Sequence, residues 1–301
     1  MNRVRVRVPA SSANLGPGFD ALALALGLHN EVAMEEDESV SVSIEGEGAA
    51  RLPRSEENVV VRGARALFDL TGRSFLGIKV TLVNRIPPGR GLGSSAAAWL
   101  GGIVGANALL GGPLLRDDVL QLAARQEGHP DNVAAALLGG LTVACWSQDK
   151  VVAVSIPVPA DLLWVVLIPE MESSTKEARA VLPHTVSRED AVFNVGRACL
   201  FVGGLLGDRP DLLGAAMEDR LHQPYRRQLF PWMDAVATAA RSAGALGCVL
   251  SGAGPSLLAV VRDGGKDVSE AMERALLHAG IRGSARTLPV DQAGAVWEAA
   301  S

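Results

Sequence analysis

The residues best suited to chemistry form a glycine-rich turn at residues 87–98, PPGRGLGSSAAA. Its glycines let the backbone come close to an anion, and free N–H groups at the start of the following helix point towards that anion. A hydroxyl there, Ser94 or Ser95, could reach a magnesium ion. The turn is not a P-loop, because no Lys-Ser or Lys-Thr follows its last glycine, and it lacks the GxGxxG spacing of dinucleotide-binding loops. It predicts a phosphate site.

The alternative interpretation of this turn is a helix start whose glycines serve only close packing. Three more glycines inside the same helix, within residues 101–105, indicate that close packing matters there. They cost about 3 kcal/mol in helix propensity relative to alanine, so the helix must press against backbone or a ligand.

Two other loops carry glycine beside polar residues. Residues 9–20, PASSANLGPGFD, hold Asn14 and Asp20, a pair that could bind an amine or a hydroxyl of a substrate. The alternative is an ordinary connection in which Asn and Asp form the turn. Residues 250–257, LSGAGPSL, join two apolar strands and are a weak signal on their own.

Glu127 closes a helix expected at residues 117–127, with Asp117 as its N-cap. The helix dipole disfavours a carboxylate at that end by about 0.3–1 kcal/mol, so its presence suggests a nearby cation, such as Mg²⁺ between phosphate oxygens. The alternative is a frayed surface glutamate. His129, two residues further on, could equally be an ordinary loop histidine.

These loops need a scaffold of strands and helices. Patterns of period two and of helical period in the first half predict strands at 4–8, 40–44 and 78–83 and helices at 58–70 and 95–110. Valine-rich strands with prolines then predict a domain boundary between 150 and 160. The elements expected beyond it are strands at 151–159, 162–168, 247–250, 257–261 and 284–289 and helices at 176–181, 190–206, 212–221, 234–243 and 268–279. This alternation indicates an α+β or α/β fold.

Composition narrows the choice of partner. A chain of 301 residues, 48% of them apolar, is long enough for two domains. Its net charge of −5, without a basic stripe, argues against nucleic acid or an anionic membrane as the main partner and favours a small molecule.

Three local features bear on location in the cell. The start, MNRVRVRVPASS, alternates valine with arginine and predicts an edge strand rather than a signal peptide. The uncharged span 91–115 is long enough to cross a membrane, but its glycines and Pro113 favour a buried helix opened by a loop. Cys145, Cys199 and Cys248 lie in apolar stretches, which predicts buried thiols in a reducing cytosol and neither disulfides nor a zinc site.

The three loops, taken in this order, resemble the three motifs of the GHMP small-molecule kinases. The pattern Pro-x-x-x-Gly-Leu-Gly-Ser-Ser-Ala in residues 87–96 is the specific part of the match. Stretches that resemble the homoserine kinase branch are ENV at 57–59, EGHPDNV at 127–133, TKEAR at 175–179 and DRLHQPYR at 219–226. The resemblance implies an α+β kinase of two domains, one over residues 1–155 like domain 2 of ribosomal protein S5 and a ferredoxin-like one over 156–301.

The resemblance also implies a set of site residues, with ATP in the cleft and L-homoserine beside it. ATP would contact Asn58, near the adenine, and the turn residues Pro88, Gly89, Arg90, Gly91, Leu92, Gly93, Ser94, Ser95, Ala96, Ala97 and Ala98. Mg²⁺ would be held by Ser95 and Glu127. L-homoserine would be surrounded by Asn14, Asp20, His129, Thr175, Arg179 and Arg226. The product would be O-phospho-L-homoserine, a step toward threonine, made by a cytoplasmic enzyme that the resemblance suggests is a homodimer.

The chemistry of the substrate agrees with these assignments. Homoserine carries an ammonium, a carboxylate and a reacting hydroxyl. Asp20 suits the ammonium, and Arg179 and Arg226 can each bind the carboxylate through a guanidinium fork. Considered alone, Arg179 could also be a solvated charge paired with Glu177 or Asp190.

Phosphoryl transfer needs mainly positioning and charge neutralisation, and the catalytic roles fall to Asn132, Arg179 and Glu127. Several other GHMP kinases have an aspartate at the position of Asn132, placed to take the hydroxyl proton, and asparagine cannot be a base. We therefore expect transfer without a dedicated protein base, with Asn132 orienting the hydroxyl. Asp131 or His129 acting as the base is the lesser alternative.

Two other functions stay open from the sequence. The first is another GHMP kinase, of the mevalonate or sugar type, which the two arginines and Asp20 disfavour because they suit a zwitterion. The second is a non-catalytic nucleotide-binding regulator with this fold, which the intact Ser95 and Glu127 disfavour.

Overall fold

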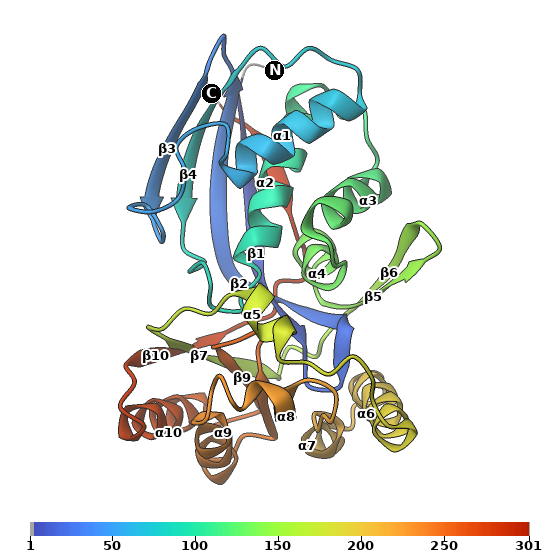
Figure 1. The fold of residues 1–301 in the computed structure, drawn as a ribbon, viewed down its shortest axis with the longest axis vertical. Helices are drawn as coiled ribbons and strands as arrows, with labels where there is room; N and C mark the ends of the chain where they lie inside the picture. The colour runs from blue at the N-terminus through green and yellow to red at the C-terminus, as the bar shows by residue number, and fades with distance from the viewer. Residues whose placement is uncertain (1–2, 301) are drawn as a thin grey trace.

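The computed structural model describes residues 3–300, which form two units that each contain one β-sheet (Figure 1). The first sheet has seven strands in the order β11-β1-β2-β4-β3, with β5 paired to β2 and β6 paired to β5. Its strands are β1 (Arg3–Asn14), β2 (Gly18–Glu36), β3 (Val40–Gly46), β4 (Ile78–Asn84), β5 (Leu141–Ser147), β6 (Lys150–Ile156) and β11 (Val296–Ala299).

Four helices cover one face of the first sheet (Figure 1): α1 (Val59–Leu70), α2 (Ser94–Leu109), α3 (Arg116–Glu127) and α4 (Asp131–Leu138). The helices α2 and α4 pack directly on β1 and β2, and α1 and α3 pack against α2. A Cβ at Gly101 would meet the side chain of Val32 at 2.7 Å, and one at Gly102 would collide with the carbonyl of Val60. The glycines inside α2 therefore allow the close packing that their presence predicted.

The second unit contains an antiparallel sheet in the order β10-β7-β9-β8. Its strands are β7 (Leu163–Pro169), β8 (Gly247–Leu250), β9 (Leu257–Val261) and β10 (Gly283–Leu288). The helices α9 (Met233–Ser242) and α10 (Gly265–His278) cover one face. The other helices are α5 (Thr175–Ala180), α6 (Arg188–Leu206), the 3₁₀ helix η1 (Pro210–Leu212), α7 (Leu213–Ala216) and α8 (Gln223–Arg226). The apolar run at 162–168 forms most of β7, which has a strand on each side as expected of a central strand.

The tip of the β1–β2 hairpin joins the two units. The N–H of Gly252 in the second unit donates to the carbonyl of Ala13 at 3.0 Å, and Asn14 Nδ2 donates to the carbonyl of Gly252 at 2.9 Å. The loops at 9–20 and 250–257, far apart in the sequence, therefore lie against each other at the boundary between the sheets.

The N-terminal strand is not an edge strand, so this expectation was wrong. β1 alternates as predicted, with Val4, Val6 and Val8 buried and Arg5 and Arg7 exposed. Its outer edge is covered by β11, which pairs with it in antiparallel fashion. No local pattern in the first residues could indicate a partner from the other end of the chain.

Two predictions about helix ends were also wrong. The N-cap of α3 is Leu115 and not Asp117, because the carboxylate of Asp118 accepts the N–H of Leu115 at 3.2 Å. The helix expected at 212–221 is only α7. After it, the Asp219 carboxylate accepts three consecutive backbone N–H groups, at residues 221, 222 and 223, which holds this stretch in a loop.

The cysteines are less buried than expected, because Cys145 and Cys199 are exposed and only Cys248 is buried. Their apolar sequence neighbourhoods do not determine on which side of a strand or helix each sulfur lies. Burial raises the pKa of the Cys248 thiol to about 12. Among residues 3–300, no helix is long and apolar enough to span a membrane, and the uncharged span 91–115 contains the buried helix α2.

Candidate active site

The glycine-rich turn lies where the three glycine-bearing loops meet. Gly91 has a φ of +70°, and a Cβ there would collide with the carbonyl oxygen of Ser251. Gly93 has a φ of +67°, and a Cβ there would collide with the hydroxyl of Ser11. Both positions therefore require glycine, for its backbone conformation and for the close approach of the other two loops.

The helix α2 begins directly after this turn and has no side-chain cap. Its N-cap is Gly93, which offers no side chain to the first-turn N–H groups. Uncapped N–H groups and the positive end of the helix dipole favour an anion at this point. The geometry agrees with the phosphate site expected from the sequence, and the close packing offered as the alternative is present as well.

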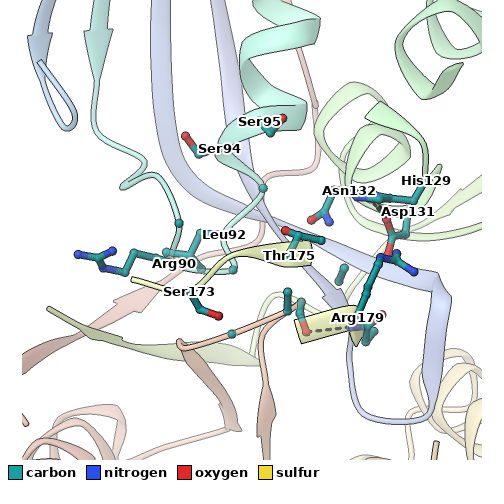
Figure 2. Close-up of a pocket in the computed structure, with 18 of the residues that line it drawn as sticks. Arg90, Leu92, Ser94, Ser95, His129, Asp131, Asn132, Ser173, Thr175 and Arg179 are labelled. Carbon is teal, nitrogen blue, oxygen red and sulfur yellow. Dashed lines mark hydrogen bonds and ion pairs between the residues drawn. The ribbon is translucent and has the colours of Figure 1, made fainter. Parts of the chain in front are cut away.

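A pocket opens between the two units at the start of α2 (Figure 2). Residues from both units and from all three loops line it. They are Ala13, Asn14, Asp20, Gly89, Arg90, Gly91, Leu92, Gly93, Ser94, Ser95, Glu127, His129, Asp131, Asn132, Ser173, Thr175, Arg179, Arg226, Gly252, Ala253 and Gly254.

Most of the expected site residues therefore come together in one pocket. The expected residues that do not line it are Asn58, Pro88, Ala96, Ala97 and Ala98. Asn58 caps α1, where its side chain accepts from the N–H of Val60 at 3.0 Å and donates to the carbonyl of Pro53 at 2.7 Å. Its expected position near the adenine stays a prediction.

Ser95 and Glu127 face each other across the start of α2 and the end of α3. The Ser95 hydroxyl donates to Glu127 Oε2 at 2.6 Å. The Glu127 side chain is only 9% exposed, so it is not the frayed surface glutamate of the alternative interpretation. Burial raises its pKa above the ordinary value, although the hydrogen bond from Ser95 and the charge of His129 act in the opposite direction. A cation at this carboxylate would remove the cost of burying its charge.

His129 and Asp131 form a polar pair in the same pocket, with His129 Nδ1 at 3.1 Å from Asp131 Oδ1. Burial lowers the pKa of His129, but its hydrogen bond to the Asp131 carboxylate and the charges of Asp131 and Glu127 outweigh this and raise the pKa above the ordinary value. An imidazole with a raised pKa is more often protonated, and in that state it donates and cannot accept a proton.

The side chain of Asn132 is oriented by Ser11. The Ser11 hydroxyl donates to Asn132 Oδ1 at 2.8 Å, which assigns the amide oxygen to Ser11 and leaves the amide NH₂ as the group available to a ligand. Asn132 stands at the start of α4, a helix that the sequence analysis did not predict. An amide NH₂ can donate to a hydroxyl or phosphate oxygen and cannot remove a proton.

Asp20 and Arg179 form an ion pair through two hydrogen bonds. Arg179 Nη1 donates to Asp20 Oδ2 at 2.9 Å and Nη2 donates to Oδ1 at 2.7 Å. The side chains are 35% and 38% exposed, and both line the pocket. Arg179 is therefore not a solvated charge paired with Glu177 or Asp190. Thr175 lies one turn earlier in α5 and lines the pocket too.

Arg226 is a deeply buried charge of the site, at 2% exposure. Its Nε donates to the carbonyl of Ala178 at 3.1 Å, and its Nη1 lies 3.0 Å from both the Gly252 carbonyl and His222 Nδ1. Burial and the charge of Arg179 lower its pKa to about 10, so it stays charged at neutral pH. It can therefore offer a desolvated positive charge to an anion in the pocket.

His222 is the buried support of this arginine. It is fully buried, and burial lowers its pKa to about 4, so it is neutral at pH 7. Its Nε2 lies 2.8 Å from the carbonyl of Gly16 and must donate to it, which leaves Nδ1 as an acceptor for Arg226. Phe19 lies beside both Arg226 and His222.

Sequence reasoning did not find several of these residues. Ser11 and His222 act through another residue, and a lone serine or histidine carries no signal of that. Ser173 and Gly252 line the pocket through loops whose position depends on contacts between the two units. The repeated serines of residues 9–20 were the one signal that could have indicated Ser11.

Comparison with known proteins places this geometry in a family. Residues 58–140 match the model of the GHMP kinases N terminal domain, and residues 202–278 match that of the GHMP kinases C terminal region. The chain is 46% identical to a homoserine kinase of Moorella thermoacetica, over 97% of this chain and 98% of the relative. The chain belongs to the GHMP kinase family. It is also 42% identical to a homoserine kinase of Carboxydothermus hydrogenoformans, over 97% of this chain and 96% of the relative.

A solved structure agrees with this result. The homoserine kinase of Cytophaga hutchinsonii superposes with a TM-score of 0.90 at 33% identity, over 99% of this chain and 98% of that one. The expected resemblance and the two-domain α+β fold of the GHMP kinases are confirmed. As a GHMP kinase, the protein is a phosphotransferase that acts on a hydroxyl group, with ATP as co-substrate.

Proposed function

We propose that this GHMP kinase is a homoserine kinase, which transfers the γ-phosphoryl group of ATP to the side-chain hydroxyl of L-homoserine. The products are ADP and O-phospho-L-homoserine, on the way to threonine. The observation that carries the proposal is one pocket that combines an uncapped helix start with a carboxylate and two guanidinium groups, Asp20, Arg179 and Arg226. The named relatives support it at 46% and 42% identity.

The charges of the pocket match those of an amino acid. We assign the substrate ammonium to Asp20 and the substrate carboxylate to Arg226, with Arg179 between them. Asp20 and Arg179 already form an ion pair with each other. A substrate that enters between them must therefore offer an opposite charge to each of the two side chains. A zwitterion brings one group of each sign, whereas a neutral sugar or a monoanion such as mevalonate that separates this pair leaves at least one of its charges without a charged partner.

We assign the nucleotide phosphates to residues 89–95, at the start of α2. Ser95 and Glu127 fit a magnesium ion, because both are oxygen ligands and their side chains already meet at 2.6 Å. Within residues 3–300 no three His, Cys, Asp or Glu side chains converge as a metal site. This agrees with an ion held by one carboxylate together with substrate phosphates, and that ion would neutralise the charge that develops on the phosphoryl oxygens.

The protein's own part in the reaction is positioning and electrostatics. The hydroxyl oxygen of homoserine forms a bond to the γ-phosphorus as the bond from that phosphorus to the β–γ bridging oxygen breaks. The Asn132 amide donates to the hydroxyl oxygen and sets its direction of attack, and Arg179 and the α2 start stabilise the transferred group. The hydroxyl proton leaves to phosphate or water, because Asn132 cannot accept it and Asp131 and Glu127 raise the pKa of His129, which favours the protonated imidazole.

The proposal also includes a domain boundary, a location in the cell and a class of partner. We place the domain boundary after residue 155, one residue before β6 ends and before β7 begins, although β11 returns from the second unit to the first sheet. We also infer a cytoplasmic enzyme that acts on small molecules, without nucleic acid or membrane as a partner, which its net charge of −5 supports.

A coupled assay of ADP release tests the proposal. L-homoserine, mevalonate and galactose are offered in turn with Mg²⁺ and ATP, and we expect turnover with homoserine to exceed that with the other two alcohols by at least 100-fold in kcat/KM. Turnover with mevalonate or galactose instead would assign the enzyme to another GHMP branch. The absence of turnover with any alcohol, in a protein that still binds ATP, would favour the nucleotide-binding regulator.

A further inference from the structure

The segment that joins β7 to α5, residues 170–174, crosses between the two units beside the glycine-rich turn. We call it the 170–174 linker. Its first residues are fixed to the second unit, because the N–H of Glu170 donates to the carbonyl of Arg282 at 2.9 Å and Met171 packs against the core of that unit. What the rest of the linker contacts therefore determines how the second unit is attached to the turn.

The middle of the linker binds to the first unit through Glu172. Its Oε1 forms ion pairs with Arg51, in the loop between β3 and α1, and with Nη1 of Arg90, in the glycine-rich turn, at 3.3 Å from the latter. The N–H of the next residue, Ser173, donates to the carbonyl of Gly89 at 3.0 Å, and Figure 2 shows Ser173 just below Arg90. The hydrogen bond from Arg51 and the charges of both arginines lower the pKa of the Glu172 carboxyl, so it is charged at neutral pH.

The helix α5 depends on this linker for its position. It has six residues and begins directly after the linker, whose last residue, Ser174, caps it by accepting the N–H of Glu177 at 3.3 Å. Ala178 is its one buried residue, and within residues 3–300 the helix has few contacts with any other helix or strand. A helix this short is not stable on its own, so the segments that hold its ends set its position.

Two arginines of the pocket depend in turn on α5. Arg179 lies in its last turn and pairs with Asp20. The carbonyl of Ala178 accepts Nε of Arg226 at 3.1 Å. A displacement of α5 would therefore move one arginine and take a hydrogen-bond partner from the other.

We propose that Glu172 is a positioning residue for the acceptor alcohol, although it lies beside the turn that we assign to the ATP phosphates. Its pairing with Arg51 and Arg90 holds the 170–174 linker on the glycine-rich turn. The linker in turn holds α5 where Arg179 and Arg226 can act on the substrate. This inference rests on the proposed function, because it takes these two arginines as part of the homoserine site.

The effect must pass through the linker, because neither Glu172 nor Arg51 lines the pocket. Their side chains are 43% and 57% exposed, and an exposed ion pair contributes little to the stability of a fold. We therefore expect their loss to change the position of α5 more than the free energy of unfolding, and to have a moderate effect on the binding of the substrate.

Steady-state kinetics of Glu172→Gln, which removes the charge and keeps the shape, test the proposal. We expect the KM for homoserine to rise about 3- to 10-fold and the KM for ATP to change by less than about 2-fold. The matched control is Glu177→Gln, in the exposed first turn of α5, which should leave both KM values unchanged. A rise in the KM for ATP alone would assign Glu172 to the nucleotide site and overturn the proposal.

A double-mutant cycle with Arg51 tests the route. Arg51→Gln should raise the KM for homoserine to a similar extent, and the double variant should show no more than the larger of the two single effects. Arg65→Gln breaks an exposed pair of 2.9 Å with Glu56 inside the first unit and should change neither KM. Additive effects of the substitutions at 51 and 172 would mean that they act separately, which would refute the ion cluster as the route.

Hydrogen exchange measured by mass spectrometry separates positioning from loss of folding. In Glu172→Gln we expect faster exchange confined to residues 170–180, with a thermal midpoint close to that of the wild type. Unchanged exchange in these residues would overturn the proposal. Faster exchange throughout the second unit would overturn it as well, because Glu172 would then stabilise the fold as a whole.

The kinetic test also separates this inference from the proposed function. If the wild type does not phosphorylate homoserine, the proposed function is refuted, and the same comparison is made with the KM of the alcohol that the enzyme accepts. If the wild type phosphorylates homoserine and Glu172→Gln keeps the wild-type KM values, this inference alone is refuted.

Discussion

The Ser95 hydroxyl and the Glu127 carboxylate meet at 2.6 Å and join the start of α2 to the end of α3. The glutamate is buried with a raised pKa, so its charge is costly in the free enzyme. A buried carboxylate with such a cost is typical of a group that binds a cation, and it does not stabilise the fold.

Replacement of Glu127 by Gln should lower kcat by about 100-fold or more, because the charge that would hold Mg²⁺ is lost. The fold should not suffer. A carboxyl whose pKa is raised in the folded state destabilises it once the pH exceeds the unfolded value, so the variant should have an equal or higher thermal midpoint at pH 7. Steady-state kinetics at varied Mg²⁺ and thermal unfolding measure the two effects, and a lower midpoint with normal kcat would contradict them.

Replacement of Arg226 by Ala should raise the KM for homoserine about 10- to 100-fold and change that for ATP far less. Its guanidinium is buried and held by His222 and the Gly252 carbonyl, and Arg179, the pocket arginine beside it, is already paired with Asp20. The neighbouring Arg227→Ala is the matched control, because Arg227 is 54% exposed and pairs with Asp234 away from the pocket. Equal increases in both KM values would count against the substrate assignment.

Replacement of Asp20 by Asn should relax recognition of the ammonium group. The ratio of kcat/KM for homoserine to that for its analogue without the amino group should fall about 10-fold or more, because the wild-type carboxylate pairs with the ammonium and the amide cannot. Asp234→Asn, which breaks an exposed pair of 2.9 Å, should leave the ratio unchanged. If this ratio is unchanged in Asp20→Asn, the ammonium binds elsewhere.

The pH profile distinguishes the roles of His129 and Asn132. In the wild type, kcat/KM should show no fall at low pH (no acid limb) that the His129→Gln substitution removes. Asn132→Asp should keep the wild-type dependence of kcat/KM on pH. His129 has a raised pKa in the folded state, so its contribution to stability is complete below pH 6.5 and is lost as the pH rises through the raised value. The free energy of unfolding should decline less in His129→Gln than in the wild type as the pH rises through the raised pKa of His129. An acid limb that belongs to His129 would make it the base.

The candidate site was predictable to the extent that its charged residues and its glycine-rich turn line the pocket. Glycine spacing indicated the phosphate turn, and the family resemblance pointed to Asp20, Arg179 and Arg226, whose residue types suit an amino acid. The supporting contacts were not predictable, because Ser11 and His222 act on residues 121 and 4 positions away through hydrogen bonds that only the fold creates. The pairing of Asp20 with Arg179 joins residues 159 positions apart and left no local trace.

The same division between local and distant contacts explains which helices and strands were predicted from the sequence and which were missed. Helices with clear periodicity, such as α1, α2 and α10, and the apolar strand β7 were expected at nearly the correct residues. β2, β5 and α4 were missed. β2 is 19 residues long and is irregular where it pairs with β1, so it lacks one steady alternation. The helix expected at 212–221 ends early, and residues 217–222 form a loop because a single carboxylate, that of Asp219, accepts backbone N–H groups there.

The pairing of β11 with β1 has a consequence for how the chain is made. β1 is the first of the described strands to be synthesised, and β11, which covers its outer edge, is the last of them. Until residues 296–299 are synthesised, β1 exposes an unpaired row of N–H and C=O groups beside three valines, which is the kind of edge that recruits other chains. Arg5 and Arg7 on its exposed face oppose such association by their charge. The nascent enzyme is therefore open to aggregation at β1 until β11 has been made.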